Sequence, residues 1–280
     1  MTNPADKIRA AVVSITATSD KKSNLENVFT MAEAAVIDGA SWISLPEMFA
    51  FHGSYPELWD HAEFEDGPLN ARLSEFARRH GVVVFAGSVG ERPEKSTGGK
   101  VYNTQYVFGR RGELLAKYRK THLFNLKDPT GKALYCESDG YLAGDSLVTL
   151  SVDGWRVGLA TCYDLRFPGV FSTLTKAQPL DCLMIPAAFT LQTGMYHWEL
   201  LLRAKAVENL CYVVAPNQVG THSPGKQSYG HGMIVDPWGT TIADTGHLPG
   251  VAVAAMTQDR IKTCRSQLPA IDNRRPELYM

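Results

Sequence analysis

Residues 155–168 have the sequence Trp155-Arg-Val-Gly-Leu-Ala-Thr-Cys162-Tyr-Asp-Leu-Arg-Phe-Pro168, in which a cysteine stands between an apolar run and a proline. Residues 157–161 form a short apolar run after Asp153-Gly154, which predicts a strand buried on both faces. Pro168 predicts the first turn of a helix, because that turn has no use for the N–H that proline lacks. A strand, a turn and a helix in succession are the repeating unit of α/β proteins.

Two helices and several strands precede this stretch. Ser23-Asn-Leu-Glu26 has the form of a capping box and predicts a helix that ends before Gly39. Gly67-Pro68 predicts the start of a second helix, and Gly81 marks its end. Apolar and β-branched runs predict strands at residues 7–17, 41–45, 82–89, 102–108 and 114–118, with the last two joined as a hairpin.

The second half of the chain repeats this order. A strand at residues 181–185 followed by Pro186 matches the strand at residues 41–45 followed by Pro46. A helix at residues 197–209 then matches the second helix of the first half, and a strand and a hairpin follow it as before. Such a repeat predicts two similar structural units.

The alternation of strands and helices predicts an α/β fold. Two similar mixed sheets with helices outside them would form a four-layer αββα sandwich. We expect residues 1–280 to form a single domain, because no linker-like stretch divides the chain. Residues 265–280 are polar and contain two prolines, which predicts an extended C-terminal tail.

The composition and charge of the chain exclude several classes of protein. The chain has 280 residues, of which 44% are hydrophobic and 20% charged, as in an ordinary soluble globular protein with room for a core. The formal net charge is -1, with no basic stretch beyond pairs such as Arg110-Arg111, so we expect no nucleic-acid partner. Residues 1–8 contain neither a signal peptide nor an apolar run that could span a bilayer. We therefore expect no membrane association and a cytoplasmic location.

The cysteines and histidines favour neither disulfides nor metal. The five cysteines are odd in number and widely spaced, and no two form a CxxC pair; they are Cys136, Cys162, Cys182, Cys211 and Cys264. The histidines show no HxxxH or HxH spacing. We expect no metal site.

Cys162 is the candidate nucleophile. It lies where the predicted strand gives way to a turn and a helix, near N–H groups that favour a thiolate. The alternative is that Cys162 packs inertly in the core, as most free cysteines do. His122 and His231 are alternative bases for a Cys–His pair.

Two charged residues supply what a thiol nucleophile lacks. Glu47 follows a strand-ending proline, and Lys120 ends a strand-like run. Attack on an amide or nitrile needs a base for the thiol proton and a positive donor for the oxyanion. Glu47 and Lys120 fit these roles, with a backbone N–H just after Cys162 as the second oxyanion donor. Taken singly, each is more commonly a solvated surface charge.

Three segments together resemble the nitrilase superfamily of carbon–nitrogen hydrolases, and they are Leu45-Pro-Glu47, Tyr118-Arg-Lys120-Thr-His-Leu-Phe124 and Cys162-Tyr-Asp-Leu-Arg-Phe-Pro168. The resemblance covers nearly the whole chain, with the segments in the family order. It implies an αββα sandwich, a Glu-Lys-Cys triad formed by Glu47, Lys120 and Cys162, no cofactor, and homodimers or larger assemblies. A further family glutamate, which positions the lysine and the substrate, matches Glu137.

A small-molecule amide is the expected substrate, cleaved through a cysteine thioester. We assign substrate binding to Tyr163, Arg166, Phe189, Thr190 and Thr193, with Arg166 as the candidate partner of a substrate carboxylate. The alternative for Arg166 is an internal salt bridge.

Arg203 is a second candidate for carboxylate binding, although a helical pair with Glu199 is the more common arrangement. Two positions depart from the amidase branch that the chain resembles. Gly169 stands where a glutamate is common, and Met195-Tyr196 replaces smaller residues, which suggests a bulky pair beside the pocket. An omega-amidase, an N-carbamoyl hydrolase, a nitrilase and a non-catalytic binding protein on the same fold remain alternatives.

Overall fold

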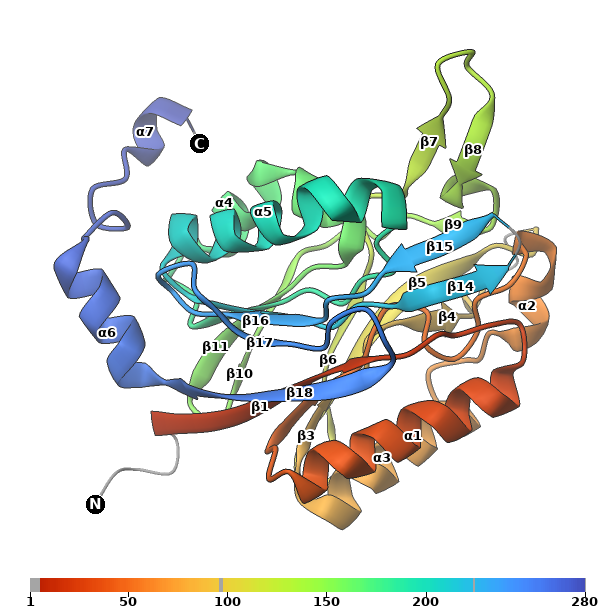
Figure 1. Ribbon diagram of the computed structural model, residues 1–280, viewed down its shortest axis with the longest axis horizontal. Helices are drawn as coiled ribbons and strands as arrows, with labels where there is room; N and C mark the ends of the chain where they lie inside the picture. Colours follow the sequence, from red (N-terminus) through yellow and green to blue (C-terminus); the bar gives the residue numbers. More distant parts are fainter. Residues whose placement is uncertain (1–5, 96–97, 224, 280) are drawn as a thin grey trace.

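Four layers make up the structure, a computed structural model that describes residues 6–95, 98–223 and 225–279. Helices α1 (Lys21–Ile37) and α3 (Pro68–His80) cover the outer face of one sheet. Helices α4 (Pro168–Leu174) and α5 (Leu191–Asn209) cover the outer face of the other (Figure 1). This is the predicted αββα sandwich.

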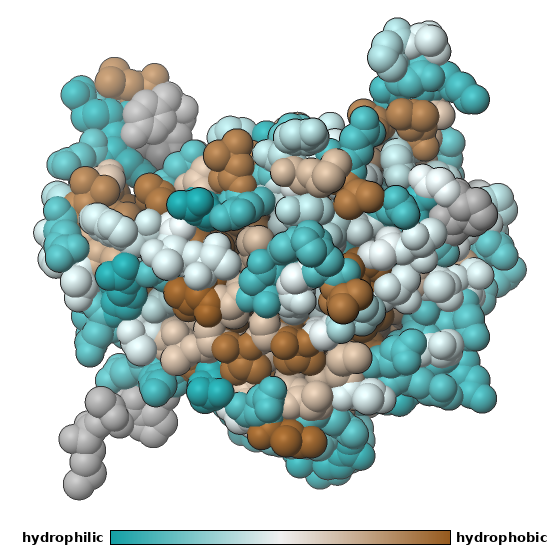
Figure 2. Space-filling view, viewed as in Figure 1, coloured by the Kyte–Doolittle hydropathy of each residue, from teal (hydrophilic) through white to brown (hydrophobic). Residues whose placement is uncertain are grey.

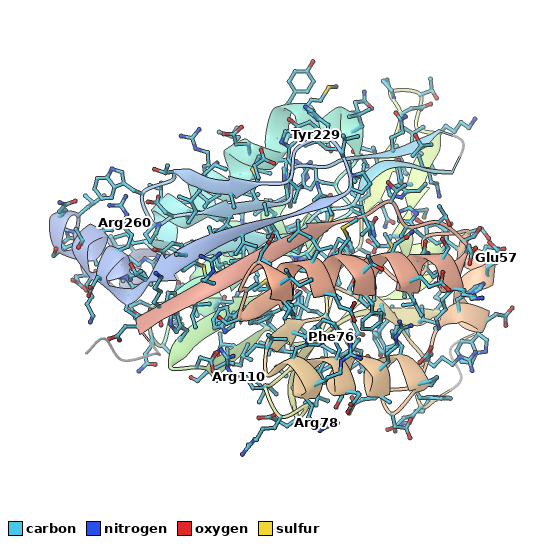
Figure 3. The ribbon with its side chains drawn as sticks, turned by 60° about the horizontal axis from the view of Figure 1, so that its bottom comes forward. Glu57, Phe76, Arg78, Arg110, Tyr229 and Arg260 are labelled. Carbon is cyan, nitrogen blue, oxygen red and sulfur yellow. The ribbon has the colours of Figure 1, made fainter. Side chains whose placement is uncertain are left out.

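The first sheet has eight strands in the described part of the chain. Its order is β18 (Gly250–Thr257), β1 (Lys7–Ser14), β2 (Trp42–Ser44), β3 (Val83–Phe85), β5 (Val101–Phe108) and β4 (Val89–Glu91), while β6 (Leu114–Arg119) and β9 (Tyr141–Leu142) also pair with β5. Strands β1, β2 and β3 are parallel, with antiparallel neighbours on both sides. Figure 3 shows α1 and α3 side by side below this sheet, where the rings of Phe76 and Phe29 lie 5.6 Å apart.

The second sheet repeats that plan with six strands among the described residues. Its order is β10 (Val148–Val152), β11 (Trp155–Leu159), β12 (Cys182–Met184), β13 (Tyr212–Ala215), β16 (Met233–Val235) and β17 (Thr241–Asp244). Strands β11, β12 and β13 are parallel, and their neighbours β10 and β16 are antiparallel. The predicted similarity of the two sheets is therefore present in their strand directions.

Shorter elements connect these layers. Two further strand pairs are β14 (Val219–Ser223) with β15 (Lys226–Tyr229), and β7 (Asn125–Lys127) with β8 (Ala133–Cys136), a hairpin that projects from the body in Figure 1. The remaining helices are η2 (Tyr55–Glu57), α2 (Leu58–His61), η3 (Glu137–Asp139), η4 (Cys162–Arg166), α6 (Gln258–Gln267) and α7 (Pro276–Tyr279). No helix of the described residues is both long enough and apolar enough to cross a membrane.

The core lies where the inner faces of the sheets meet. Trp42 of the first sheet and Trp155 of the second are fully buried, with ring centroids 5.9 Å apart. Burying two such large rings stabilises the contact between the sheets. The outer surface is mixed, and Figure 2 shows apolar side chains gathered over β17 and β18. The single-domain organisation stays a prediction, which this shared core favours.

Two predicted element starts are wrong. Helix α1 begins two residues before the expected capping box, because Asp20 is the N-cap and accepts a hydrogen bond from the N–H of Ser23. Helix α5 begins at Leu191 instead of residue 197. Gly194 lies inside it, where an added Cβ would come within 2.3 Å of Tyr229, so close packing explains a glycine in the first turns.

Two other predictions need correction. The strand expected at residues 82–89 is two strands, β3 and β4, separated at Gly87, whose φ of +46° bends the chain. The C-terminal tail is not extended throughout, because residues 265–267 complete α6 and α7 follows later. Arg265 donates to the backbone oxygens of Leu180 and Leu210, which holds the end of α6 against the second sheet.

Candidate active site

Cys162 lies at the carboxyl end of β11, at the first residue of η4. Its φ is +46°, a left-handed conformation that is uncommon for residues other than glycine and often found at functional turns. Its N–H donates to the carbonyl oxygen of Pro186 at 2.9 Å, which fixes the turn beside the end of β12. The side chain is 9% exposed and borders two hollows described below.

Glu47 follows β2 and Pro46 and reaches the same place from the first sheet. The carboxylate is 1% exposed and accepts a hydrogen bond from the N–H of Ala188 at 2.7 Å. The Cys162 thiol lies close enough to this carboxylate for the charge of Glu47 to raise the pKa of the thiol. The side-chain amide of Gln218 donates to the Glu47 carbonyl oxygen at 2.9 Å, so the backbone of this turn is held as well. Glu47 is therefore positioned to exchange a proton with Cys162.

Lys120 lies between two glutamates. Its Nζ is 2.9 Å from Oε1 of Glu47 and 2.8 Å from Oε2 of Glu137. Burial lowers the pKa of Lys120, but the two carboxylates outweigh burial and raise it well above its ordinary value. Burial raises the pKa of Glu137, although Lys120 opposes this shift. Lys120 is thus a fixed cation, as an oxyanion donor must be.

The thiol of Cys162 is not in an environment that favours a thiolate. Burial raises its pKa well above the ordinary value, the negative charge of Glu47 adds to this, and Lys120 opposes it. The expectation that helix N–H groups favour the thiolate is therefore wrong, because burial and a neighbouring carboxylate dominate. A base is needed to remove the thiol proton during the reaction.

Asn103 is a site residue that sequence reasoning missed. Its side-chain amide nitrogen, on β5, lies 2.9 Å from Oε1 of Glu47 and 3.2 Å from Oε1 of Glu137. One amide therefore holds both carboxylates in place. The available signal was the polar run Asn103-Thr104-Gln105 between apolar residues of a predicted strand, because buried polar groups need polar partners.

Asp164 is the second missed residue, and it joins the Lys120 segment to the Cys162 turn. Its fully buried carboxylate accepts hydrogen bonds from the Tyr118 hydroxyl at 2.6 Å and from the N–H of Thr161 at 2.8 Å. The His122 ring lies 2.8 Å from the same carboxylate. His122 is therefore part of the support for the site and does not pair with the thiol.

A cavity opens in front of these groups. It has about 600 Å³ of space not filled by atoms, part of which is open to solvent. Its lining includes the four predicted catalytic residues and a largely aromatic wall, and it consists of Glu47, Met48, Phe51, His52, Gly53, Tyr55, Leu58, Lys120, Phe124, Tyr135, Glu137, Tyr141, Cys162, Ala188, Thr190 and Lys226. Such a mostly apolar cavity with a few convergent polar groups is typical of a small-molecule site.

A smaller hollow of about 230 Å³ adjoins the main cavity, with which it shares Phe124, Cys162, Ala188 and Thr190. All five residues predicted to bind substrate line it, and they are Tyr163, Arg166, Phe189, Thr190 and Thr193. The Arg166 guanidinium lies 5.2 Å from the Phe189 ring centroid, and its nitrogens lie 3.3 Å from Nδ1 of His197. Arg166 takes part in none of the ion pairs found among the described residues, so the expected alternative of an internal salt bridge is not seen there.

Other candidates lie outside the site. Arg203 donates to the carbonyl oxygen of Gly239 and pairs with Glu199 at 3.4 Å on the surface of α5. His231 contacts Asp244 at 2.8 Å, away from both hollows. Tyr196 is exposed and lines neither hollow. Met195 lines a groove that shares Tyr135, Thr190 and Lys226 with the main cavity, so one member of the expected bulky pair does lie beside the pocket.

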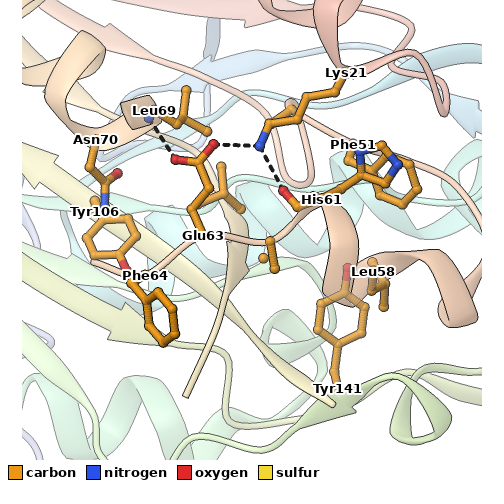
Figure 4. Close-up of a pocket in the computed structure, with 14 residues that line it drawn as sticks. Lys21, Phe51, Leu58, His61, Glu63, Phe64, Leu69, Asn70, Tyr106 and Tyr141 are labelled. Atoms are coloured by element: carbon orange, nitrogen blue, oxygen red, sulfur yellow. Dashed lines mark hydrogen bonds and ion pairs between the residues drawn. The ribbon is translucent and has the colours of Figure 1, made fainter. Parts of the chain in front are cut away.

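A separate cavity of about 430 Å³ lies behind Phe51, Leu58 and Tyr141, which it shares with the main cavity (Figure 4). There Lys21 pairs with Glu63 at 2.6 Å. None of the predicted site residues lines this cavity.

A buried thiol that shares a cavity with a carboxylate and a fixed ammonium group, in an αββα sandwich, is the arrangement of a cysteine-dependent hydrolase. The chain belongs to the carbon-nitrogen hydrolase family, whose profile matches residues 9–266. The protein is thus a hydrolase that acts on carbon–nitrogen bonds other than peptide bonds.

Several relatives are similar over most of this chain. A deaminated glutathione amidase from Synechocystis is 39% identical over 95% of this chain and 97% of its own length. The deaminated glutathione amidase of Homo sapiens is 38% identical over 96% of this chain and 83% of its own length. The crystal structure of the Caenorhabditis elegans NitFhit protein has a TM-score of 0.89 at 34% identity, covering 98% of this chain and 66% of the worm chain.

Proposed function

We propose that this protein hydrolyses deaminated glutathione to α-ketoglutarate and cysteinylglycine. The observation that carries the reaction is that Cys162, Glu47 and Lys120 line one cavity, with Lys120 paired to Glu47. The substrate is inferred from relatives at 38–39% identity that bear this name. The segment Ser228-Tyr-Gly-His231 also favours this branch, because related omega-amidases usually carry extra residues within it.

In the first half-reaction Glu47 takes the thiol proton while the sulfur of Cys162 attacks the amide carbon. Negative charge develops on the carbonyl oxygen, and Lys120 and the N–H of Tyr163 stabilise it. Tyr163 is the second residue of η4, where the N–H groups of a helix lack intrahelical acceptors. Glu47 then gives its proton to the leaving nitrogen, the carbon–nitrogen bond breaks, and a thioester remains.

Water completes the second half-reaction. Glu47 removes a proton from water, whose oxygen attacks the thioester carbon. The carbon–sulfur bond breaks, and the sulfur recovers the proton from Glu47. Glu137 touches Lys120 through both carboxylate oxygens, so we assign to it the positioning of that cation.

The smaller hollow is proposed to hold the acyl part of the substrate. Arg166 would bind the α-keto acid carboxylate, because a guanidinium forms paired hydrogen bonds with carboxylates. Thr190 and Thr193, whose hydroxyl oxygens lie 2.8 Å apart, add polar groups to the same hollow.

A coupled assay tests this function. Purified protein is mixed with deaminated glutathione, α-ketoglutaramate or a simple nitrile, and the release of α-ketoglutarate or ammonia is measured. We expect the highest kcat/KM on deaminated glutathione. A higher kcat/KM on α-ketoglutaramate would make the protein an omega-amidase, and no turnover of any amide would refute the proposal.

Two further properties belong to this proposal. A homodimer or larger assembly is favoured by exposed apolar side chains on α5, where Met195, Tyr196 and Leu200 are 54%, 73% and 66% exposed. Light scattering after gel filtration measures the molecular mass.

We also propose a cytoplasmic location, because all five cysteines are free thiols.

A further inference from the structure

Lys226 is a charged residue that the proposed reaction does not use. It lies on β15 and lines the main cavity together with Cys162 and Glu47. Its Nζ lies 5.5 Å from the ring centroid of Tyr55 and 5.8 Å from that of Tyr135. No carboxylate of the described residues forms an ion pair with it, so its charge is not neutralised there by the protein.

The charge of Lys226 acts toward the interior of the cavity. The pKa of His52, which also lines the cavity, is lowered to about 3, mainly by burial and in part by the charges of His222 and Lys226. Contacts with two aromatic faces stabilise an ammonium group only modestly and leave its hydrogen-bond donors available. An anion in the cavity would be a stronger partner.

The position of Glu47 decides which part of a substrate meets Lys226. Glu47 protonates the leaving nitrogen, so the leaving group must lie on the side of Cys162 that Glu47 occupies. Glu47 lines the main cavity and does not line the smaller hollow that contains Arg166. The acyl group therefore points toward Arg166, and the leaving group extends through the main cavity toward Lys226.

Lys226 stands at the mouth of this path. Besides the main cavity it lines an adjoining groove, open to solvent, beside Tyr135 and Leu134 of the projecting β7–β8 hairpin. A leaving group that extends from Cys162 through the main cavity to this mouth would place its far end near the ammonium group.

We propose that Lys226, with Tyr55 and Tyr135 beside it, forms a subsite for a carboxylate at the far end of the leaving group. The class of substrate is an amide with an acid at each end, one bound by Arg166 and the other by Lys226. This inference rests on the proposed function, since cysteinylglycine ends in a carboxylate whereas the ammonia released from an ω-amide carries none.

The test compares substrates that differ only in the leaving group. Wild type, K226M and K226R are assayed on deaminated glutathione, on its C-terminal carboxamide and on α-ketoglutaramate, which shares the acyl group. K132M is the matched control, because Lys132 is an exposed lysine between β7 and β8 that lines neither hollow. Melting temperatures establish that each variant is folded.

In K226M the ratio of kcat/KM for deaminated glutathione to that for α-ketoglutaramate should fall by about 10- to 100-fold, mainly through KM, because a hydrogen bond to a charged group is lost. K226R should keep most of this ratio, and K132M should match wild type. For wild type, kcat/KM on the carboxamide should be lower than kcat/KM on deaminated glutathione by a similar factor. For K226M the two values should be equal.

Two results would overturn the subsite, and they are distinguishable. If wild type prefers deaminated glutathione and K226M keeps the same ratio, the subsite is wrong while the proposed function stands. If wild type hydrolyses α-ketoglutaramate and not deaminated glutathione, the proposed function fails and the subsite fails with it.

Discussion

In each half of the molecule a strand is followed by a proline, but the residues after the two prolines have different chemical roles. Strand β2 leads to Pro46, and β12 leads to Pro186. After Pro46 comes Glu47, whose carboxylate lines the same cavity as the thiol. After Pro186 come two alanines, and here the backbone acts, since the Pro186 oxygen accepts from Cys162 and the Ala188 N–H donates to Glu47.

This difference shows how a repeated fold produces one asymmetric site. The first half contributes the ionisable groups Glu47, Lys120 and Glu137, and the second half contributes the thiol and backbone groups that hold it. Asp164 joins the two contributions by bonding to Tyr118 and Thr161. Neither half contains a complete site.

Removal of the thiol, which the second half contributes, should have the largest effect. C162A should lower kcat by on the order of 10⁴-fold or more, because no other group can form the thioester. The melting temperature should change little, since only one sulfur atom is removed. C182A is the matched control, a buried cysteine on β12 away from the cavity, and it should keep its activity. Residual turnover by C162A within tenfold of wild type would refute the mechanism.

E47Q removes the carboxylate that the first half contributes. Glutamine cannot accept the thiol proton, so kcat should fall by about 10²- to 10⁴-fold. The measurement is single-turnover thioester formation, followed by mass spectrometry. E26Q, on the exposed surface of α1, should behave as wild type. Normal thioester formation by E47Q would show that another group is the base.

Acid stability tests a place where the halves meet, because His52 of the first half stacks on His222 of the second at 4.0 Å. With its pKa lowered to about 3 from 6.5, folded His52 binds fewer protons than the unfolded chain between those pH values. Its contribution is therefore present above pH 6.5 and lost as the pH falls toward 3. Urea unfolding at pH 7 and pH 4 should show a loss about 2 to 4 kcal/mol smaller in H52F than in wild type. Equal losses would contradict this, and H80Q serves as the control.

Asn103 tests how the first half holds its two carboxylates in place. N103L removes the amide that holds Glu47 and Glu137, so kcat should fall by about 10- to 100-fold with KM nearly unchanged. A purely structural role would lower the melting temperature and leave kcat of the folded fraction intact. N273A, at an exposed position after α6, is the control.

The smallest expected effect separates two arginines of the second half. R203A should leave kcat and KM unchanged and reduce the free energy of unfolding by about 1 kcal/mol or less, because its pair with Glu199 is exposed. R166A should instead raise KM for substrates with an acyl carboxylate. Steady-state kinetics of both variants decide whether the hollow at Arg166 binds substrate.

Much of the fold follows from local patterns. Pro68 and Gly81 mark the two ends of α3, and the strands before Pro46 and Pro186 lie where their apolar runs predict. The error at α1 is local, because Asp20 caps that helix, whereas the error at α5 arises where distant residues decide the outcome. The start of α5 depends on Gly194 packing against Tyr229, which no local pattern reveals.

The site shows the same division. The three motifs identify residues that the structure brings around one cavity, because Glu47 and Lys120 follow strands of the first sheet and Cys162 follows a strand of the second sheet packed against it. Asn103 and Lys226 belong to no such motif, and their importance depends on which side chains they face across the fold. A sequence pattern gives the identity of a buried asparagine or a lysine but not its neighbours.

The raised pKa of Cys162 has a consequence for the resting protein. Two carboxylates, Glu47 and Glu137, share one ammonium group from Lys120, and a thiolate would add another negative charge to this enclosed cluster. The sulfur therefore keeps its proton until a carbonyl arrives. Since peroxide attacks thiolates far faster than thiols, the carboxylate that we propose as the base in turnover would also protect the sulfur from oxidation between turnovers.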